Sequence, residues 1–324
     1  MKKSAMALAF QTLRRKPMVL LLLLPVPIIS VIVSAISLQT LPDLNKMLDM
    51  NYLMNYASGM ETTQSMMISN MISMLVSSVS MILSLCSLFL LVPAAMEMLA
   101  DGAAGRETAP GWFTRGMRRH WWKPITDSSI TGGIFAVLFI PLYIVFIILV
   151  SLAVTGMTMG TITNYSDSSS LDSINGIMSG IVTPLLIAVI VFAGIVYVLE
   201  LLVSSVFGLF LPALADRGFG EAFKLLFSKK GFRKLPRMLG GKALITLVPG
   251  FIYTALYAVY LLITGLPADV MGYLINFLSF MKSWAGILGL LLMSIIGILV
   301  YPFRFGVHQL IRDEEASLPI QIQK

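Results

Sequence analysis

Residues 130–154 read ITGGIFAVLFIPLYIVFIILVSLAV and contain no Asp, Glu, Lys or Arg. About 20 apolar residues in a helix are enough to cross the hydrocarbon core of a bilayer. Five further stretches share this character, with one glutamate among them: Met18–Leu38, Met66–Val92, Ile177–Phe207, Ala243–Ile263 and Trp284–Tyr301. The sequence therefore predicts an all-α, polytopic membrane protein with six transmembrane helices.

The composition of the whole chain agrees with this prediction. Hydrophobic residues make up 57% of the chain and charged residues 12%, whereas soluble proteins average about 45–50% and about 25%. The net charge of +7 lies on the loops, where it indicates attraction to the anionic lipids of the inner leaflet. No motif for binding DNA or RNA accompanies that charge, so we expect no nucleic-acid partner.

The basic residues alternate between the two sides of the predicted bundle. Five lie in the N-terminal segment, five in the second loop and eight in the fourth loop, whereas the intervening loops hold only Lys46 and Lys282. Short loops that are rich in Lys and Arg stay in the cytoplasm. We therefore expect a multi-pass protein of the cell membrane with both termini in the cytoplasm.

Prolines at matching positions indicate a threefold internal repeat. Each odd-numbered span follows a basic residue near a proline, carries a second proline, and is followed by a span that ends in a third. The three sets are Lys16, Pro17, Pro25 and Pro93; Lys123, Pro124, Pro141 and Pro212; and Lys234, Pro236, Pro249 and Pro302. The sequence predicts three parallel hairpins at about 18–101, 124–216 and 236–311, which do not by themselves imply transport. The prolines either bend helices around a cavity or only fit the helices together.

Two flanking segments frame the membrane domain at 18–311. Residues 1–17 place Met6, Ala9, Phe10 and Leu13 on one helical face, which predicts an amphipathic helix at the membrane interface. Residues 312–324 are expected to form a cytoplasmic tail, with a solvated acidic cluster at 313–315.

The second span carries a stripe of serines at spacings of three and four residues. The stripe consists of Ser65, Ser69, Ser73, Ser77, Ser80, Ser84 and Ser87. Residues at these spacings share one helical face. Small hydroxylated residues let two helices approach closely; alternatively, Ser73, Ser77, Ser80 and Ser84 form the polar wall of an internal cavity.

Glu200 is the one ionisable residue deep inside a predicted span. An unpaired carboxylate at that depth is costly, so we expect Glu200 to be protonated, paired or turned toward a polar cavity. Two roles are open for Glu200: a structural hydrogen bond to another helix, or a functional polar site.

Two cytoplasmic loops combine aromatic and basic residues in a pattern typical of the membrane interface. The second loop contributes Trp112, Trp121 and Trp122, and the fourth contributes Phe219, Phe223, Phe227, Lys229 and Lys230. Aromatic rings and basic side chains are both suited to the lipid head-group layer. The same residues are alternatively a docking surface for a cytosolic partner.

Catalytic motifs are missing from the sequence. It contains only two histidines, His120 and His308, and one cysteine, Cys86. We find no H-E-x-x-H, G-x-S-x-G, P-loop or dinucleotide-binding pattern. We therefore expect no catalytic residues, no metal site and no cofactor.

Several loop sequences resemble a diffuse group of six-helix prokaryotic membrane proteins. The segment from Ala213 to Leu235 reads ALADRGFGEAFKLLFSKKGFRKL, and residues 102–123 and 301–315 are similar in layout. The group includes YciC-like envelope proteins and the membrane domain fused to some glycerophosphodiester phosphodiesterases. The resemblance implies a six-span helical fold with an envelope role, and it carries no catalytic residue to this chain.

A second resemblance concerns the first span. The segment LRRKPMVLLLLLP, from Leu13 to Pro25, looks like the beginning of the first span in type-2 ABC exporter permeases, which also have six spans. The threefold repeat is not a feature of that fold. Since the chain has no nucleotide-binding motif, such a permease would require a separate ATPase as its partner.

These patterns favour a non-enzymatic membrane protein that acts in envelope maintenance, by binding lipid or by assisting a membrane complex. One alternative is the membrane subunit of an ABC-type exporter. Another is a self-protection protein against a membrane-active peptide.

Overall fold

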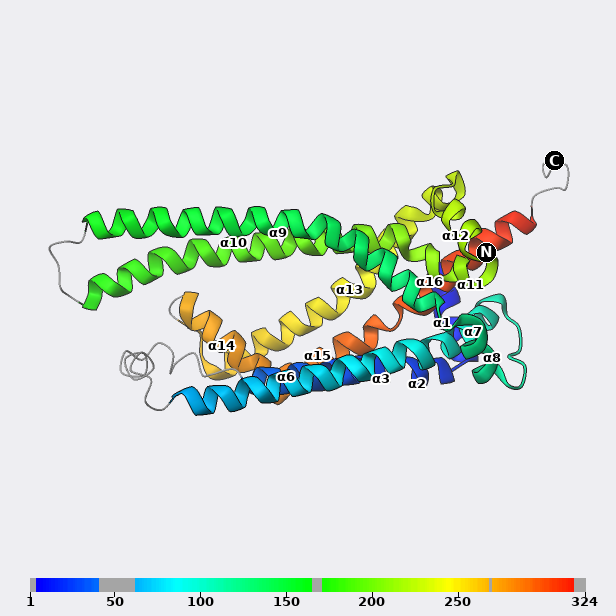
Figure 1. Cartoon of the computed structure of the whole chain (residues 1–324), viewed down its shortest axis with the longest axis horizontal. Helices are drawn as coiled ribbons and strands as arrows, with labels where there is room; N and C mark the ends of the chain where they lie inside the picture. The colour runs from blue at the N-terminus through cyan, green and yellow to red at the C-terminus, as the bar shows by residue number, and fades with distance from the viewer. Residues whose placement is uncertain (1–3, 41–61, 165–170, 268–269, 318–324) are drawn as a thin grey trace.

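The computed structural model of the chain describes residues 4–40, 62–164, 171–267 and 270–317 (Figure 1). Within these ranges the structure is helical and contains no strand. Six helical stretches are long and apolar enough to cross a membrane: Met18–Gln39, Met74–Ala104, Lys123–Ala153, Ile187–Arg217, Lys229–Thr264 and Trp284–Ala316. The predicted all-α, multi-pass architecture is therefore confirmed.

The helices follow one another in three groups. The first group contains α1 (Ala5–Arg15), α2 (Met18–Leu23), α3 (Pro25–Thr40), α6 (Thr62–Cys86), the π-helical turn η1 (Ser87–Leu91), α7 (Val92–Ala104) and α8 (Trp112–His120). The second contains α9 (Lys123–Asn164), α10 (Leu171–Val206), the 3₁₀ turn η2 (Phe207–Leu209), α11 (Phe210–Arg217) and α12 (Phe219–Leu226). The third contains α13 (Lys229–Thr264), α14 (Val270–Lys282), α15 (Trp284–Gly297) and α16 (Val300–Ala316).

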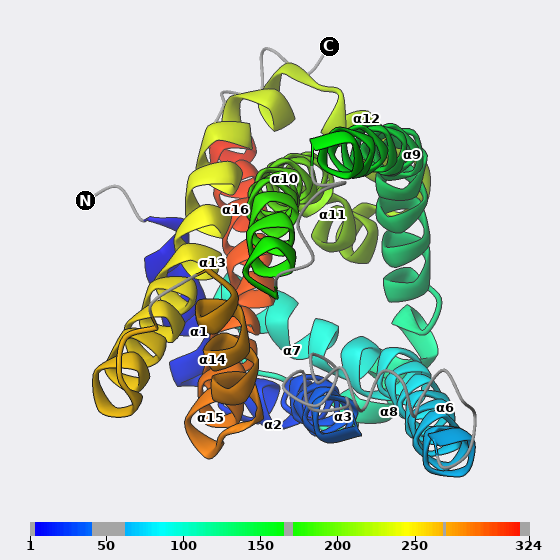
Figure 2. The same ribbon diagram turned by 90° about the vertical axis from the view of Figure 1, so that its left-hand side faces the viewer.

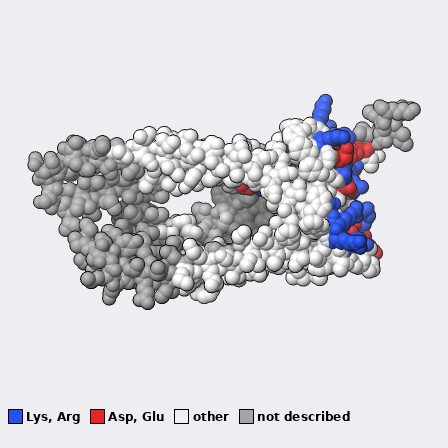
Figure 3. All heavy atoms as spheres, viewed as in Figure 1, with Lys and Arg blue, Asp and Glu red and all other residues white. Residues whose placement is uncertain are grey.

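The spans are arranged in an open arc. Neighbours pack in the order α6, α3, α15, α13, α10 and α9. Seen from the end, the arc leaves the ribbons of α6 and α9 apart (Figure 2). In the space-filling view the α9/α10 pair separates from the lower group of helices toward one end of the molecule (Figure 3).

The opposite end of the molecule holds the packed core and nearly all of the charge. Figure 3 shows the Lys, Arg, Asp and Glu side chains gathered there, and we call this the charged end. Two clusters of buried side chains lie at this end and draw on α1, α2, α7, α11 and α16. Phe210 and Leu99 are fully buried, whereas Leu152 and Ile263 in the outer halves of their spans are 66% and 79% exposed. The outer halves therefore require hydrocarbon as their solvent.

Each even-numbered span has an irregular turn just before the proline at its charged end. The π-helical turn η1 precedes Pro93, η2 precedes Pro212, and a turn at residues 298–299 precedes Pro302. Proline has no N–H, so the carbonyl four residues earlier loses its helical partner. The helices α7, α11 and α16 begin at these breaks and pack against one another.

A lysine at the start of each hairpin contacts the charged end of the same hairpin. The three contacts are Lys16 beside Gly102, Lys123 Nζ to the Ala215 carbonyl at 3.3 Å, and Lys234 with Glu314. Each hairpin is thus closed on itself at the charged end.

The fifth span begins earlier than its apolar window indicates. Helix α13 starts at Lys229, after Ser228 has capped it by accepting a hydrogen bond from Gly231 N. The acidic cluster also differs from expectation, because α16 continues through Ala316 and holds Glu315 against Arg217 and Lys230. Glu314 and Glu315 therefore pair with basic residues, whereas Asp313 is exposed and accepts a hydrogen bond from Gln309. Residues 318–324 lie outside the described part.

The N-terminal helix α1 packs onto the protein core. Leu8 and Ala9 are buried against α16, where a Cβ added to Gly306 would lie 2.8 Å from the Ala5 carbonyl oxygen. Phe10 remains 55% exposed. Much of the apolar face expected at the membrane interface is thus covered by protein, and contact of the remaining surface with lipid stays a prediction.

Candidate functional site

The glutamate expected in the fourth span is paired with a lysine. Glu200 on α10 accepts a hydrogen bond from Lys242 Nζ of α13 at 2.9 Å, and Lys242 also donates to Ser204 Oγ. The Lys242 side chain is 11% exposed, whereas that of Glu200 is 47% exposed. A charge next to its counter-ion is far less costly at this depth than an isolated one.

A second polar contact extends this seam between α10 and α13. The hydroxyls of Tyr197 and Thr246 lie 2.6 Å apart, and Thr246 also donates to the Lys242 carbonyl. Lys242 and Thr246 are four residues apart and so share a helical face. Lys242 belongs to the fourth loop by its sequence position and was therefore not predicted as the partner of Glu200; its place just before the apolar window is the signal that could have identified it.

The structure describes only part of the serine stripe. The side chains of Ser73, Ser77 and Ser84 lie outside the described residues. Ser80 is half-buried and Ser87, in the π-helical turn, is 4% exposed. Burial is thus documented where the stripe reaches the charged end, and the choice between packing face and cavity wall stays open for the rest.

One arginine joins three helices behind the polar seam. Arg304 of α16 contacts both carboxylate oxygens of Asp127 in α9, at 2.9 and 3.0 Å. It also donates to the Gly208 carbonyl at 2.6 Å, which is the carbonyl that Pro212 leaves without a helical N–H. The carbonyl freed by the break in the fourth span is thus hydrogen-bonded by a residue of the sixth span. This junction was not predicted from the sequence.

A buried histidine lies on the other side of the charged end. His120 of α8 is 2% exposed, and its Nε2 lies 2.9 Å from Glu97 Oε2 of α7. Arg115 also donates to Glu97. Burial, together with the positive charge of Lys123, lowers the pKa of His120 from 6.5 to about 4, although Glu97 acts in the opposite direction. His120 is therefore neutral at pH 7, and because Nε2 faces a carboxylate it is the nitrogen that carries the proton.

This pKa predicts loss of stability in acid. The unfolded chain protonates His120 near pH 6.5 and the folded chain near pH 4, so the unfolded state binds more protons between these values and is favoured as the pH falls. Unfolding midpoints of the detergent-solubilised protein should decrease from pH 6.5 toward 4, and less steeply in His120→Gln. Equal slopes for the two proteins would contradict the assignment, whatever their absolute midpoints.

The aromatic and basic residues of the fourth loop lie on one short helix and its exit. Phe219, Phe223 and Phe227 are 42–57% exposed; the first two rings stack, and the third is tilted against Phe223. Lys229 is exposed, whereas Lys230 is engaged by Glu315. Exposed aromatic rings beside lysines suit the boundary between head groups and acyl chains.

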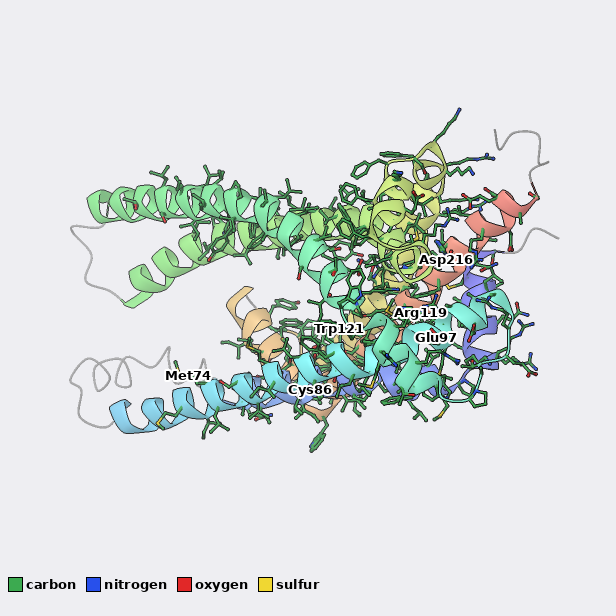
Figure 4. All side chains as sticks on the ribbon, turned by 45° about the vertical axis from the view of Figure 1, so that its right-hand side comes forward. Met74, Cys86, Glu97, Arg119, Trp121 and Asp216 are labelled. Atoms are coloured by element: carbon green, nitrogen blue, oxygen red, sulfur yellow. The ribbon has the colours of Figure 1, made fainter. Side chains whose placement is uncertain are left out.

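The three tryptophans of the second loop are not equivalent. Trp121, labelled in Figure 4, is 53% exposed, whereas Trp112 and Trp122 are half-buried and pack against the two core clusters. Only Trp121 of the three is thus well placed to enter a head-group layer or to meet a partner.

An apolar groove runs between α9 and α10. Its volume is about 580 Å³, and it is lined by Leu142, Val145, Phe146, Leu149, Val150, Ala153, Pro184, Leu185, Ile187, Ala188, Val191, Phe192 and Ile195. The size lies in the range of small-molecule sites, but the wall offers no charged side chain. The groove therefore suits a hydrocarbon chain.

The described residues hold no group of three or more His, Cys, Asp or Glu side chains that could bind a metal ion.

Searches of family models, curated proteins and solved structures found no match to this chain. The fold and side-chain geometry are therefore the basis for a functional proposal.

Proposed function

We propose that this chain is a non-enzymatic integral membrane protein that binds lipid, as part of maintaining the envelope of a prokaryotic cell. The observation that carries the proposal is the apolar groove between α9 and α10. A groove of this kind within a bilayer is filled by hydrocarbon, because no other abundant solvent is present at that depth.

The position of the groove relative to the polar seam also supports the proposal. The six spans follow an arc in which α6 and α9 stand apart (Figure 2). Ile195 at the end of the groove is five residues from Glu200 on the same helix, which is about 8 Å along its axis. An amphipathic ligand could thus place its chain in the groove and approach the half-exposed Glu200 carboxylate with its polar group.

We also infer that the three hairpins are equivalent units with the charged end in the cytoplasm. The distribution of Lys and Arg supports this orientation, and the matching helix breaks and lysine contacts support the equivalence. Labelling of a single cysteine placed at Asp167 from inside the cell would overturn the orientation.

The lipid proposal is tested by native mass spectrometry of the protein purified in mild detergent. We expect the wild-type chain to retain lipid at a fixed stoichiometry. Ala188→Phe, which fills the groove, should lose that lipid, whereas Val189→Phe, on the neighbouring exposed position outside the groove, should retain it.

Lipid retained equally by the two variants would refute the groove as the binding site. A stoichiometric ATPase in the purified sample would favour the exporter interpretation instead. Glu200→Gln removes the charge of the polar seam and leaves the groove intact. Lipid retention by this variant therefore separates the role of the groove from that of the seam.

A further inference from the structure

Both histidines of the chain line one small polar pocket at the charged end. The pocket has a volume of about 80 Å³ and is formed where α7, α8, α11 and α16 meet. His120 and His308 are 2% and 4% exposed, and no described residue hydrogen-bonds to Nδ1 of His120 or Nε2 of His308. Buried polar atoms are rarely left without partners, so each such nitrogen calls for a ligand or water.

The acidic residues of the pocket are already neutralised by neighbouring arginines. Glu97 pairs with Arg115, as described above. Asp216 pairs with Arg312 at 3.1 Å. Asp101, the third carboxylate, has Arg106 at 3.5 Å. These pairs leave little uncompensated negative charge in the pocket.

The third arginine of the pocket is not engaged by a described carboxylate. Arg119 is exposed, lines the pocket next to His120 and makes no ion pair within the part of the chain that the structure describes. Figure 4 shows Arg119 beside Glu97 and Asp216 at the charged end. Arg106 and Arg312 also line the pocket, so guanidinium groups from three segments of the chain surround it. Guanidinium groups match the geometry of oxyanions, to which they donate paired hydrogen bonds.

We propose that this pocket binds a phosphate group, as inorganic phosphate or as the monoester head group of a lipid. The guanidinium of Arg119 contacts the charged oxygens. His120 donates Nε2–H to Glu97 and therefore presents the lone pair of Nδ1. A hydrogen phosphate supplies the P–OH donor that this lone pair requires, whereas sulfate and phosphodiesters carry no such hydrogen at neutral pH.

Other occupants fit less well. A metal ion lacks ligands, because no three metal-binding side chains among the described residues are close enough to share one. Water fits the volume, since one molecule needs only about 10–15 Å³ of such space. Water, however, brings no negative charge to the exposed guanidinium of Arg119. The proposal is independent of lipid binding in the α9/α10 groove, which is formed by different helices.

Calorimetric titration of the full chain in a neutral detergent with inorganic phosphate tests the proposal. We expect saturable binding at neutral pH, with sulfate weaker by roughly tenfold or more. Arg119→Gln should weaken phosphate binding by a similar factor. Arg118→Gln is the matched control, because Arg118 is the adjacent exposed residue of α8 and does not line the pocket; it should change the affinity by less than about twofold.

Two results would overturn the proposal: no saturable phosphate binding, or equal weakening by the two arginine variants, which would indicate general surface charge. Equal affinity for sulfate would overturn the role of His120 and hence the choice of phosphate. The source of the phosphate group is determined by titrating inorganic phosphate into nanodiscs of phosphatidylcholine with and without added phosphatidic acid. Loss of free-phosphate binding identifies the lipid head group as the occupant, and unchanged binding identifies free phosphate.

Discussion

Replacement of Arg304 by glutamine is expected to lower the free energy of unfolding by about 3–5 kcal/mol. The substitution leaves the Asp127 carboxylate, only 9% exposed, without its counter-ion. It also removes the donor to the Gly208 carbonyl, which Pro212 has already deprived of its helical partner. Denaturant unfolding in detergent micelles measures the loss, and much of the variant should fail to elute as a monodisperse species.

Two further variants make this prediction specific. Lys224→Gln breaks an ion pair with Glu221 in which both side chains are more than half exposed, so its effect should stay within about 1 kcal/mol. Adding Asp127→Asn to Arg304→Gln removes the stranded charge and should restore part of the lost stability. A double variant no more stable than the single one would show that the ion pair is not the cause.

Gly241→Ala is expected to destabilise the protein by about 1–3 kcal/mol. A Cβ at this position would lie 2.0 Å from the Phe303 ring, with three ring atoms within 2.7 Å. Phe303 is 3% exposed and belongs to the buried cluster at the charged end. The ring therefore has no free space to move into, and α13 would be pushed away from α16.

The adjacent glycine supplies a control of opposite sign. Gly240 is exposed on the same helix, and a Cβ there would have nothing within 4 Å. Gly240→Ala should raise the free energy of unfolding by up to about 0.5–1 kcal/mol, because alanine loses less backbone entropy in a helix. Similar changes for the two alanine variants would contradict the close contact between Gly241 and Phe303.

The positions of the spans could be predicted because each depends on local composition. An apolar window such as residues 130–154 must form a helix in a bilayer, whatever surrounds it. The start of α13 at Lys229 could not be predicted in this way. The basic residues there indicate a loop, and their acceptors, Glu314 and Glu315, lie 80 and 85 residues further along the chain than Lys234 and Lys230.

Residues of the candidate sites were likewise predictable only where the local sequence distinguishes them. Glu200 could be found because it stands alone in an apolar window, whereas its partner Lys242 lay outside every window. Asp127 and Arg304 are separated by 177 positions, and no local pattern near either residue indicates the other as its partner. Charged partners from distant hairpins are fixed by tertiary packing, which composition and periodicity do not encode.

The fit of α1 against α16 has a consequence for the order of biosynthesis. Ala5 and Ala9 are synthesised about 300 residues before Gly306, against which this helix rests. The lysine of each hairpin can meet its partner as soon as that hairpin is complete, but α1 must wait exposed through synthesis of all three. An unburied α1 therefore marks a chain in which α16 is not yet in place, and its burial marks a chain in which the two helices have met.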